Sequence, residues 1–283
     1  SNIPEFIFIV PYRDREAQLS IFLSHMPYLL EGLNHEVYFA HQKDRRFFNR
    51  GAMKDIGFIH AKEKYPDHYK DINFVFHDVD TFLSKKGMTD FKTTKGIVKH
   101  VLGFERTFGG IFVMKGSDFE NMNGFPCIWN WGMEDNALKL RWLTKMKKGN
   151  DKKIDYTQFH HINSKKVIML WHGDQKVFNR HEAWNAYERS TNFKDGINKI
   201  RNIVKTEVDM DLHSNFESEK GKWKMINITH FIPATLPPKT AERKEIKSIR
   251  DQHFGYDKKK QEALQKNRHH QIRKNFSMNF RNN

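Results

Sequence analysis

Three apolar runs alternate with helical patterns over the first part of the chain. The runs EFIFIV, HEVYFA and INFVFH cover residues 5–10, 35–40 and 72–77. They are rich in the aromatic and β-branched residues that favour strands. The segments Ala17–Leu30 and Ala52–Lys64 between them have the spacing of helices. This βαβαβ order predicts an α/β fold whose central sheet is mainly parallel and covered by helices.

The pattern is less regular after the third run. Residues 85–106 are rich in Gly, Lys and Thr, which predicts a long loop. A further strand is expected at Phe108–Met114, and a helix is expected to begin near Glu134 or Asp135.

The end of the chain differs in composition from the rest. After Pro237-Pro238 the sequence favours helix, is basic and contains few large apolar residues. We therefore expect one domain over residues 1–233, followed by a basic helical tail over residues 234–283 that is partly disordered.

The net charge of +15 over 283 residues raises the possibility of a nucleic-acid-binding protein. The charge is unevenly distributed, however. Residues 234–283 contain 13 Lys and Arg against 5 Asp and Glu, a net of +8, and the first 233 residues contain 36 against 29, a net of +7. Because the body is only mildly basic and no RNA-recognition, helix-turn-helix or zinc-finger pattern is present, nucleic-acid binding is the weaker alternative.

Cysteine content bears on the compartment. Cys127 is the only cysteine, so no intramolecular disulfide can form, which favours a reducing, cytoplasmic location. No run approaches the roughly 20 apolar residues that span a bilayer, and the first residues, SNIPEFIFIV, contain no basic leader. We expect the protein to be cytoplasmic and peripheral to a membrane. Since the sequence does not begin with Met, this expectation leaves room for an anchor before Ser1.

Two aspartates follow the third apolar run, in the stretch FVFHDVD. Asp78 and Asp80 project the same way from an extended chain, and two carboxylates so close repel each other unless a cation lies between them. A metal or nucleotide site is one interpretation. The other is an acidic turn in which Asp bonds its own backbone.

Two arginines follow the first apolar run, in the stretch PYRDR. The carboxyl ends of parallel strands meet at one edge of a sheet, so Arg13 and Arg15 are expected to face the same crevice as Asp78 and Asp80. Guanidinium groups there suit the recognition of phosphate or carboxylate, and surface salt bridges are the alternative.

The stretch IWNWGMED combines aromatic and acidic residues. Trp129 and Trp131 could supply flat surfaces that stack on sugar rings or bases. Glu134 and Asp135 lie at the start of the expected helix, where carboxylates are favoured simply as caps. Beside an aromatic platform, the same carboxylates could instead act on a sugar hydroxyl.

A histidine ends the apolar stretch VIMLWH. His172 in such a place is more often structural than a ligand, but together with Asp78 and Asp80 it becomes a candidate imidazole ligand. Oxygen plus nitrogen ligation suits manganese. Met169 is an unusual partner, because a thioether is a soft ligand for so hard an ion.

Taken in order, the stretches PYRDR, FNRGAMKDIGF, FVFHDVD, FGGIFVMKGSDFENMNGFPCIWNWGMED and MLWH resemble the β-1,4-galactosyltransferase family, family 7 of the glycosyltransferases. The likeness runs from about Ile7 to His172. It implies a Rossmann-like GT-A fold and a manganese-dependent, inverting transfer of galactose or N-acetylgalactosamine from a UDP-sugar to a glycan hydroxyl. A catalytically inactive sugar-binding relative is a further alternative, against which the acidic residues and His172 argue.

The resemblance also implies roles for individual residues. Asp80, Met169 and His172 match the metal ligands, Glu134 the acid that binds the acceptor, and Asp135 the catalytic base, which a helix N-terminus should keep ionised near neutral pH. The expected donor-binding residues are Pro11, Arg13, Arg15, Phe48, Asn49, Arg50, Asp78, Val79, Thr107, Gly109, Gly110 and Trp131.

Departures from the family pattern affect the substrates. The run WNWGMEDNA replaces the family's W-G-W-G-G-E-D-D-D, which leaves the acceptor open. Thr107 stands before F-G-G where the family can have a tyrosine that crowds a 2-acetamido group, so we expect UDP-N-acetylgalactosamine to be used at least as well as UDP-galactose. The basic tail is expected to meet an anionic membrane or an acidic glycan.

Overall fold

The computed structural model describes residues 3–130, 132–147, 153–170, 187–188, 190–212 and 222–234, which belong to one compact unit. Trp131, His172 and the predicted tail from residue 235 onward lie outside the described residues. In the described part of the chain, no helix is long and apolar enough to cross a membrane.

The first half of the sheet has the predicted βαβαβ order. Its elements are β1 (Phe6–Tyr12), α1 (Glu16–Leu30), β2 (His35–Gln42), α2 (Arg50–Lys64) and β3 (Asn73–His77). β1 pairs in parallel with both β2 and β3, and Phe6 lies opposite His35 on one side and Asn73 on the other. All seven residues of β1 are buried, which explains why this strand reads as a continuous apolar run.

The remaining elements extend the sheet on both sides. They are β4 (Thr81–Leu83), β5 (Ile97–Gly103), β6 (Ile111–Lys115), α3 (Gly116–Asn121), α4 (Glu134–Lys147), β7 (Lys153–Asp155), β8 (His160–His161), β9 (Val167–Met169), the short 3-10 helix η1 (Ile197–Lys199), β10 (Arg201–Asp209) and β11 (Trp223–Ile232). The main sheet has the order β10-β11-β2-β1-β3-β6-β5-β7, with β8 also pairing with β5, and β4 and β9 form a separate pair. The sheet is mainly parallel, as predicted.

The prediction of a long loop over residues 85–106 was wrong, because β5 lies within it. Lys99 and His100 interrupt the apolar pattern of this strand, yet both are buried. The Lys99 ammonium pairs with Asp90, and the His100 ring packs on Phe108 at a centroid distance of 5.9 Å. The ion pair of Lys99 and the ring contact of His100 allow both side chains to be buried within the strand.

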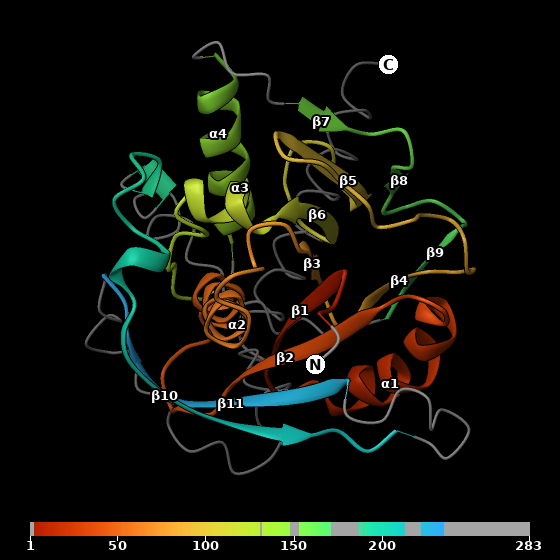
Figure 1. Ribbon diagram of the computed structural model, residues 1–283, viewed down its shortest axis with the longest axis horizontal. Helices are drawn as coiled ribbons and strands as arrows, with labels where there is room; N and C mark the ends of the chain where they lie inside the picture. The colour runs from red at the N-terminus through yellow and green to blue at the C-terminus, as the bar shows by residue number, and fades with distance from the viewer. Residues whose placement is uncertain are drawn as a thin grey trace, which may run out of the picture. The chain divides into compact units, whose positions relative to one another are not determined.

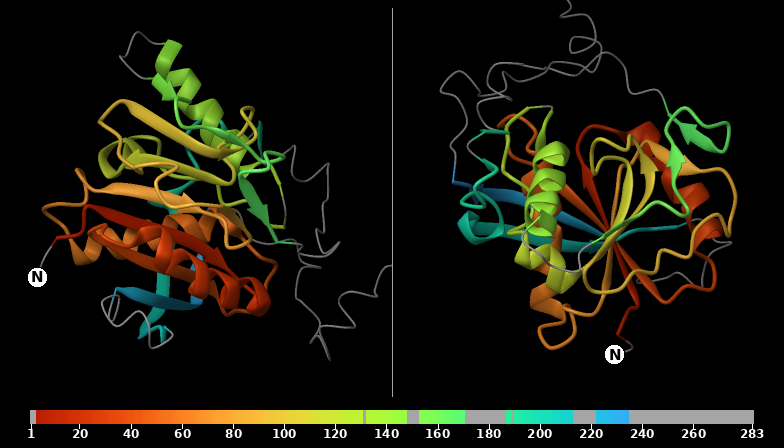
Figure 2. Two further views of the ribbon diagram at one scale, coloured as in Figure 1. Left: turned by 90° about the vertical axis from the view of Figure 1, so that its right-hand side faces the viewer. Right: turned by 90° about the horizontal axis from the view of Figure 1, so that it is seen from above.

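The sheet has an apolar core on each face. Phe8 on β1 packs with Phe22 of α1 on one face, whereas Ile9 packs with Phe58 of α2 and Trp142 of α4 on the other. Figure 1 accordingly shows α1 to the right of β1 and α2, α3 and α4 to its left, and Figure 2 shows the same elements from two further directions. The N-termini of α2 and α4 therefore come together on one side of the sheet.

Candidate active site

The N-terminus of α2 carries two basic residues toward the site. Asn49 begins the helix, and its side-chain oxygen accepts a hydrogen bond of 2.9 Å from the Ala52 N–H, which is the usual capping contact. Arg50 and Lys54 follow, four residues apart, so they lie one above the other on the same face of the helix.

The N-terminus of α4 carries the two acidic residues that pair with them. Arg50 Nη1 lies 3.4 Å from Glu134 Oε1, and Lys54 Nζ donates to Asp135 Oδ1 at 2.8 Å. Lys54 was missed in the sequence, because a lysine beside an aspartate in a helix is typical of a solvated surface. Its side chain is instead 2% exposed.

Arg141 fixes the position of α4 through buried hydrogen bonds. Its guanidinium is fully buried and donates to the carbonyl oxygens of Gly124 (2.7 Å), Ser190 (2.6 Å) and Asp195 (2.6 Å). Since Arg141 lies two turns after Glu134, these bonds tie the helix to two loops and hold its acidic end in place.

The end of β3 is joined to the segment Thr107–Gly110. The Asp78 N–H donates to the Gly110 carbonyl at 3.1 Å, and the Gly110 N–H donates to Asp78 Oδ2 at 3.3 Å. Gly110 has a φ of +81°, and a Cβ there would lie 2.4 Å from the Leu102 carbonyl oxygen, so only glycine fits. This contact fixes Gly109 beside the site.

Gly109 brings the same segment against Asp135. A Cβ built on Gly109 would lie 3.0 Å from Asp135 Oδ2 and 3.2 Å from Thr107 Oγ1. The Gly109 N–H donates to Thr107 Oγ1 at 3.2 Å, and the Phe108 N–H donates to the Asp135 carbonyl at 3.3 Å. Thr107, Gly109 and Asp135 therefore line one small region.

Opposite charges are gathered at this region from four parts of the chain. Burial alone would disfavour the charge on Arg50, but the nearby carboxylates outweigh it and raise the pKa of Arg50. Burial lowers the pKa of Arg15, an effect that Asp80 opposes. The set consists of the cations Arg15, Arg50 and Lys54 and the carboxylates Asp78, Asp80, Glu134 and Asp135.

The expectation that a helix N-terminus keeps Asp135 ionised near neutral pH was wrong. The pKa of Asp135 is raised to about 7, chiefly by burial, while Lys54 lowers it and Glu134 and Asp78 raise it further. Desolvation of the carboxylate therefore exceeds the benefit of the helix terminus, and Asp135 is poised between its two protonation states at neutral pH.

Several predicted donor-binding residues have structural contacts. Arg13 donates to the carbonyls of Arg46 (2.6 Å) and Asp44 (3.1 Å) and so orders the chain after β2. Pro11 is buried within β1, and the Val79 side chain is buried in the core on the α1 face. Val79 can therefore reach a ligand only through its backbone.

Two further predicted residues lie where α2 begins. The Asn49 amide nitrogen, at the helix cap, is buried and has no hydrogen-bond partner among the described residues. The Phe48 carbonyl accepts from the Asn130 N–H at 3.0 Å, which holds Asn130 beside the start of α2.

The turn that precedes α4 is strained. Asn130 and Met133 have φ values of +70° and +73°. For a residue as bulky as methionine this region is uncommon, and such strain tends to concentrate at functional sites.

The interpretation of Trp129 as an exposed stacking surface was wrong. Its side chain is 8% exposed, its ring stacks on Phe231 with centroids 5.8 Å apart, and the Arg46 guanidinium lies 5.0 Å from its centroid. Trp129 is therefore part of the core beneath the site.

The β4–β9 pair brings one predicted metal ligand to Asp80. Thr81 lies opposite Met169 in this pair, and the Leu170 N–H donates to the Asp80 carbonyl at 2.8 Å. Met169 is 48% exposed, so its sulfur is accessible. The described residues contain no group of three His, Cys, Asp or Glu side chains arranged around a metal, and His172 lies outside them.

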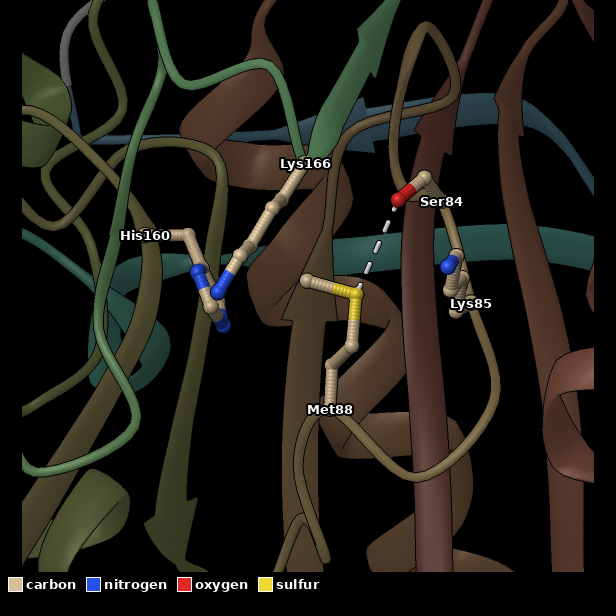
Figure 3. A pocket seen from close by; sticks show the side chains of 5 residues that line it. All are labelled: Ser84, Lys85, Met88, His160 and Lys166. Atoms are coloured by element: carbon tan, nitrogen blue, oxygen red, sulfur yellow. Dashed lines mark hydrogen bonds between the residues drawn. The ribbon is translucent and has the colours of Figure 1, made fainter.

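A separate cavity of about 410 Å³ lies near β4, β8 and β9. Figure 3 shows the residues that line it, Ser84, Lys85, Met88, His160 and Lys166. None of them belongs to the charged cluster, so this cavity is distinct from the candidate active site.

The chain matches two models of one enzyme family. Residues 4–89 match the N-terminal region of glycosyl transferase group 7, and residues 92–165 match a second group 7 model, described as the N-terminal domain of galactosyltransferase.

Individual relatives agree with these family models. β-1,4-Galactosyltransferase 7 of Drosophila melanogaster is 26% identical over 225 residues, which cover 74% of this chain and 67% of the relative. β-1,4-Galactosyltransferase 4 of Cricetulus griseus is 32% identical over 174 residues, which cover 56% and 48%. The chain thus spans between about half and two thirds of the length of these relatives.

The structure is also similar to solved structures. A mutant of Drosophila β-1,4-galactosyltransferase 7, in complex with manganese, UDP-Gal and xylobiose, superposes with a TM-score of 0.59 at 22% identity, covering 79% of this chain and 93% of that one. A second structure, the catalytic domain of Drosophila β-1,4-galactosyltransferase 7 in complex with xylobiose, superposes with a TM-score of 0.58 at 22% identity and covers the same fractions of the two chains.

The sheet order and the similarity to these solved structures define a fold of the GT-A class. Within that class, the chain belongs to glycosyltransferase family 7.

Proposed function

We propose that this protein is an inverting β-galactosyltransferase or β-N-acetylgalactosaminyltransferase that uses a UDP-sugar and manganese and acts on a glycan hydroxyl. The observation that carries the proposal is the position of Asp135. One of its oxygens is held by Lys54, the other lies against Gly109, and Arg50 and Asp78 surround it in a chain of family 7. Manganese, UDP-Gal and xylobiose bind to the Drosophila neighbour, which supports the same classes of ligand here.

The chemistry follows from these contacts. Asp135 accepts the proton of the acceptor hydroxyl as its oxygen forms a bond to the anomeric carbon. The bond from that carbon to the UDP oxygen breaks on the opposite face, and UDP leaves with the electron pair. Because the displacement is a single step without an enzyme nucleophile, the configuration inverts. Arg15 and Arg50 are placed to balance the charge of the departing diphosphate.

Asp80, Met169 and His172 would hold the metal. Asp80 is partly exposed beside Arg15 and Arg50. The next residue, Thr81, pairs with the accessible Met169 on β9, so the two described ligands are placed to bind a metal ion. A bound manganese ion supplies positive charge to the diphosphate leaving group.

Hydrolysis of UDP-galactose and UDP-N-acetylgalactosamine in the presence of manganese tests the proposal. Water replaces the unknown acceptor, so the assay needs no knowledge of the glycan. Release of UDP that depends on manganese supports the proposal. No UDP release from either donor, by a folded protein that also fails to bind UDP, would contradict it.

The contacts of Thr107 predict the donor preference. Its hydroxyl lies in the small region formed with Gly109 and Asp135, and the side chain is short enough to leave room for a 2-acetamido group. We expect Thr107→Tyr to lower kcat/KM for UDP-N-acetylgalactosamine relative to UDP-galactose by about tenfold or more, since overpacking a well-formed site is costly.

Thr107→Val is the matched control, because it removes the hydroxyl while keeping the size. It should leave the ratio of the two donors nearly unchanged if space decides the preference. The prediction is wrong if the natural protein strongly prefers UDP-galactose, or if the tyrosine variant has the natural ratio.

The basic segment 234–283 is proposed to keep a cytoplasmic protein at an anionic membrane surface or acidic glycan. Its net charge of +8 supports this, since each basic residue near an anionic surface contributes about 1 kcal/mol. A chain that ends at Pro233 should hydrolyse UDP-sugar normally but lose binding to vesicles that contain phosphatidylserine. Neutral vesicles are the control, and undiminished binding of the shortened chain to the anionic vesicles would refute the assignment.

A further inference from the structure

Lys54 is unusual among the lysines of α2. Lys62 and Lys64, on the last turns, pair with Glu120 and Glu36 and remain partly exposed. The Lys54 side chain is 2% exposed, and its ammonium lies 4.6 Å from the centroid of the Phe125 ring. An ammonium is rarely buried so completely, because it loses its hydration shell.

The surroundings of Lys54 keep it charged. Burial alone would lower the pKa of Lys54, but Asp135, Asp78 and Glu134 outweigh this effect and raise it. The hydrogen bond to Asp135 Oδ1 is 2.8 Å long, and both groups lie on helices whose positions are fixed by buried contacts. These contacts therefore hold the ammonium in a fixed position beside Asp135 Oδ1.

The two oxygens of Asp135 consequently face different groups. Oδ1 is occupied by the ammonium, while Oδ2 lies beside Gly109, 3.0 Å from the position that a Cβ would take there. A carboxylate whose one oxygen is bound in this way cannot rotate freely about χ2, so its second oxygen is presented in a constant direction.

We propose that Lys54 is a positioning residue for the base Asp135: its ammonium fixes Oδ1 and so presents Oδ2, at Gly109, as the oxygen that takes the proton from the attacking hydroxyl. This inference rests on the proposed function. It adds a group that contacts no substrate and acts only through Asp135.

The charge of Lys54 also acts on the titration of Asp135. Burial raises the pKa of Asp135 to about 7, Lys54 opposes the rise, and Glu134 and Asp78 add to it. Arg50, on the previous turn of α2, also faces the carboxylates. His100, which lies behind Gly109, is neutral in this range because burial lowers its pKa to about 4.

The sign of the effect follows. A base must be deprotonated, so activity is lost as the pH falls through the pKa of Asp135. Removing the Lys54 cation leaves burial unopposed, and the acidic limb of the pH profile moves to higher pH. An opposite charge at this distance typically shifts a carboxyl pKa by about 1 unit or more, so the variant should lose about tenfold in kcat below the limb and recover at alkaline pH.

The test compares Lys54→Met, Lys54→Arg and Lys64→Met in the full chain with saturating UDP-galactose and manganese. Lys54→Met should move the acidic limb of kcat upward by about 1 pH unit or more, with KM for the donor and affinity for UDP unchanged. Lys54→Arg should restore most of the position of the limb, because it keeps the charge. Lys64→Met, on the same helix and paired with Glu36, should give the natural profile.

The outcomes separate the two proposals. If the folded natural protein neither releases UDP from either donor nor binds UDP, the proposed function fails. If it is active and Lys54→Met binds UDP normally but keeps the natural pH profile, only the role of Lys54 is refuted. If Lys54→Met does not fold, Lys54→Arg provides the test. A loss of activity of about tenfold at neutral pH in Lys54→Arg, which keeps the cation, would also contradict the charge-based role.

Discussion

Asp135→Asn lowers the turnover of UDP-sugar by about 10²-fold or more, while the affinity for UDP changes little. The substitution removes the proton acceptor at nearly constant shape. Asparagine still offers its side-chain oxygen to the Lys54 ammonium, so the buried lysine keeps a hydrogen-bond partner and the protein stays folded. Alanine at the same position would leave Lys54 buried and unpaired, so a loss of chemistry could not be distinguished from a loss of stability.

The measurement is single-turnover UDP release together with calorimetry of UDP binding. Natural protein should lose activity as the pH falls through about 7, because protonated Asp135 cannot accept a proton. The asparagine variant should lose this dependence as well as the rate. Glu134→Gln is the control on the neighbouring residue, and it should act mainly on the apparent affinity for the acceptor. Near-normal turnover in the Asp135 variant would refute the base assignment.

The first half of the fold could be predicted because its strands are almost completely buried. A strand with both faces covered has a nearly continuous apolar run, so β1, β2 and β3 stand out from the helices between them. β5 could not be found in this way, since Lys99 and His100 lie inside it and their partners are contributed by other segments. A buried polar residue does not reveal in the sequence which group it pairs with.

The same limitation explains which site residues were missed. Lys54 and Asp135 are 81 positions apart, and only the packing of α2 against α4 brings them to 2.8 Å. Trp129 was misassigned for a related reason, because its stacking partner Phe231 lies on β11, near the other end of the described chain. Glu134 and Asp135 were found because a local signal, the start of a helix after an aromatic turn, marks them.

The pKa of Asp135 shows why the position of a residue in a helix does not by itself predict its protonation state. The helix terminus favours the carboxylate, as the sequence suggests. Burial opposes it with a larger effect, and burial depends on how Gly109 and Phe108 close over the helix end. The protonation of this residue is thus a property of the assembled site.

Asp80→Ala abolishes the dependence of UDP binding on manganese, and we expect the manganese-dependent affinity to fall by about 10²-fold or more. In many metal sites, losing a residue that only hydrogen-bonds to a ligand lowers metal affinity by about 10- to 100-fold. Asp80 is itself a predicted ligand and the only carboxylate in the predicted set, so its loss should cost at least as much. Thr81 Oγ1 donates to Asp80 Oδ1 at 3.1 Å, a contact that orients the carboxylate from the adjacent residue. Met169→Ala should do less harm, because a thioether binds a hard ion weakly.

Calorimetry of UDP with manganese, and again with the metal chelated, separates metal binding from folding. Arg15 and Arg50 remain in the Asp80 variant, so the weak affinity for UDP measured without metal should persist or rise slightly as a nearby negative charge is removed. Asp209→Ala, on the exposed strand β10, is the control and should bind as the natural protein does. His172→Ala should match Asp80→Ala in losing only the manganese-dependent part. If both variants retained that part in full, Asp80 and His172 would not be the ligands, and the diphosphate would have to be held by the arginines of the site alone.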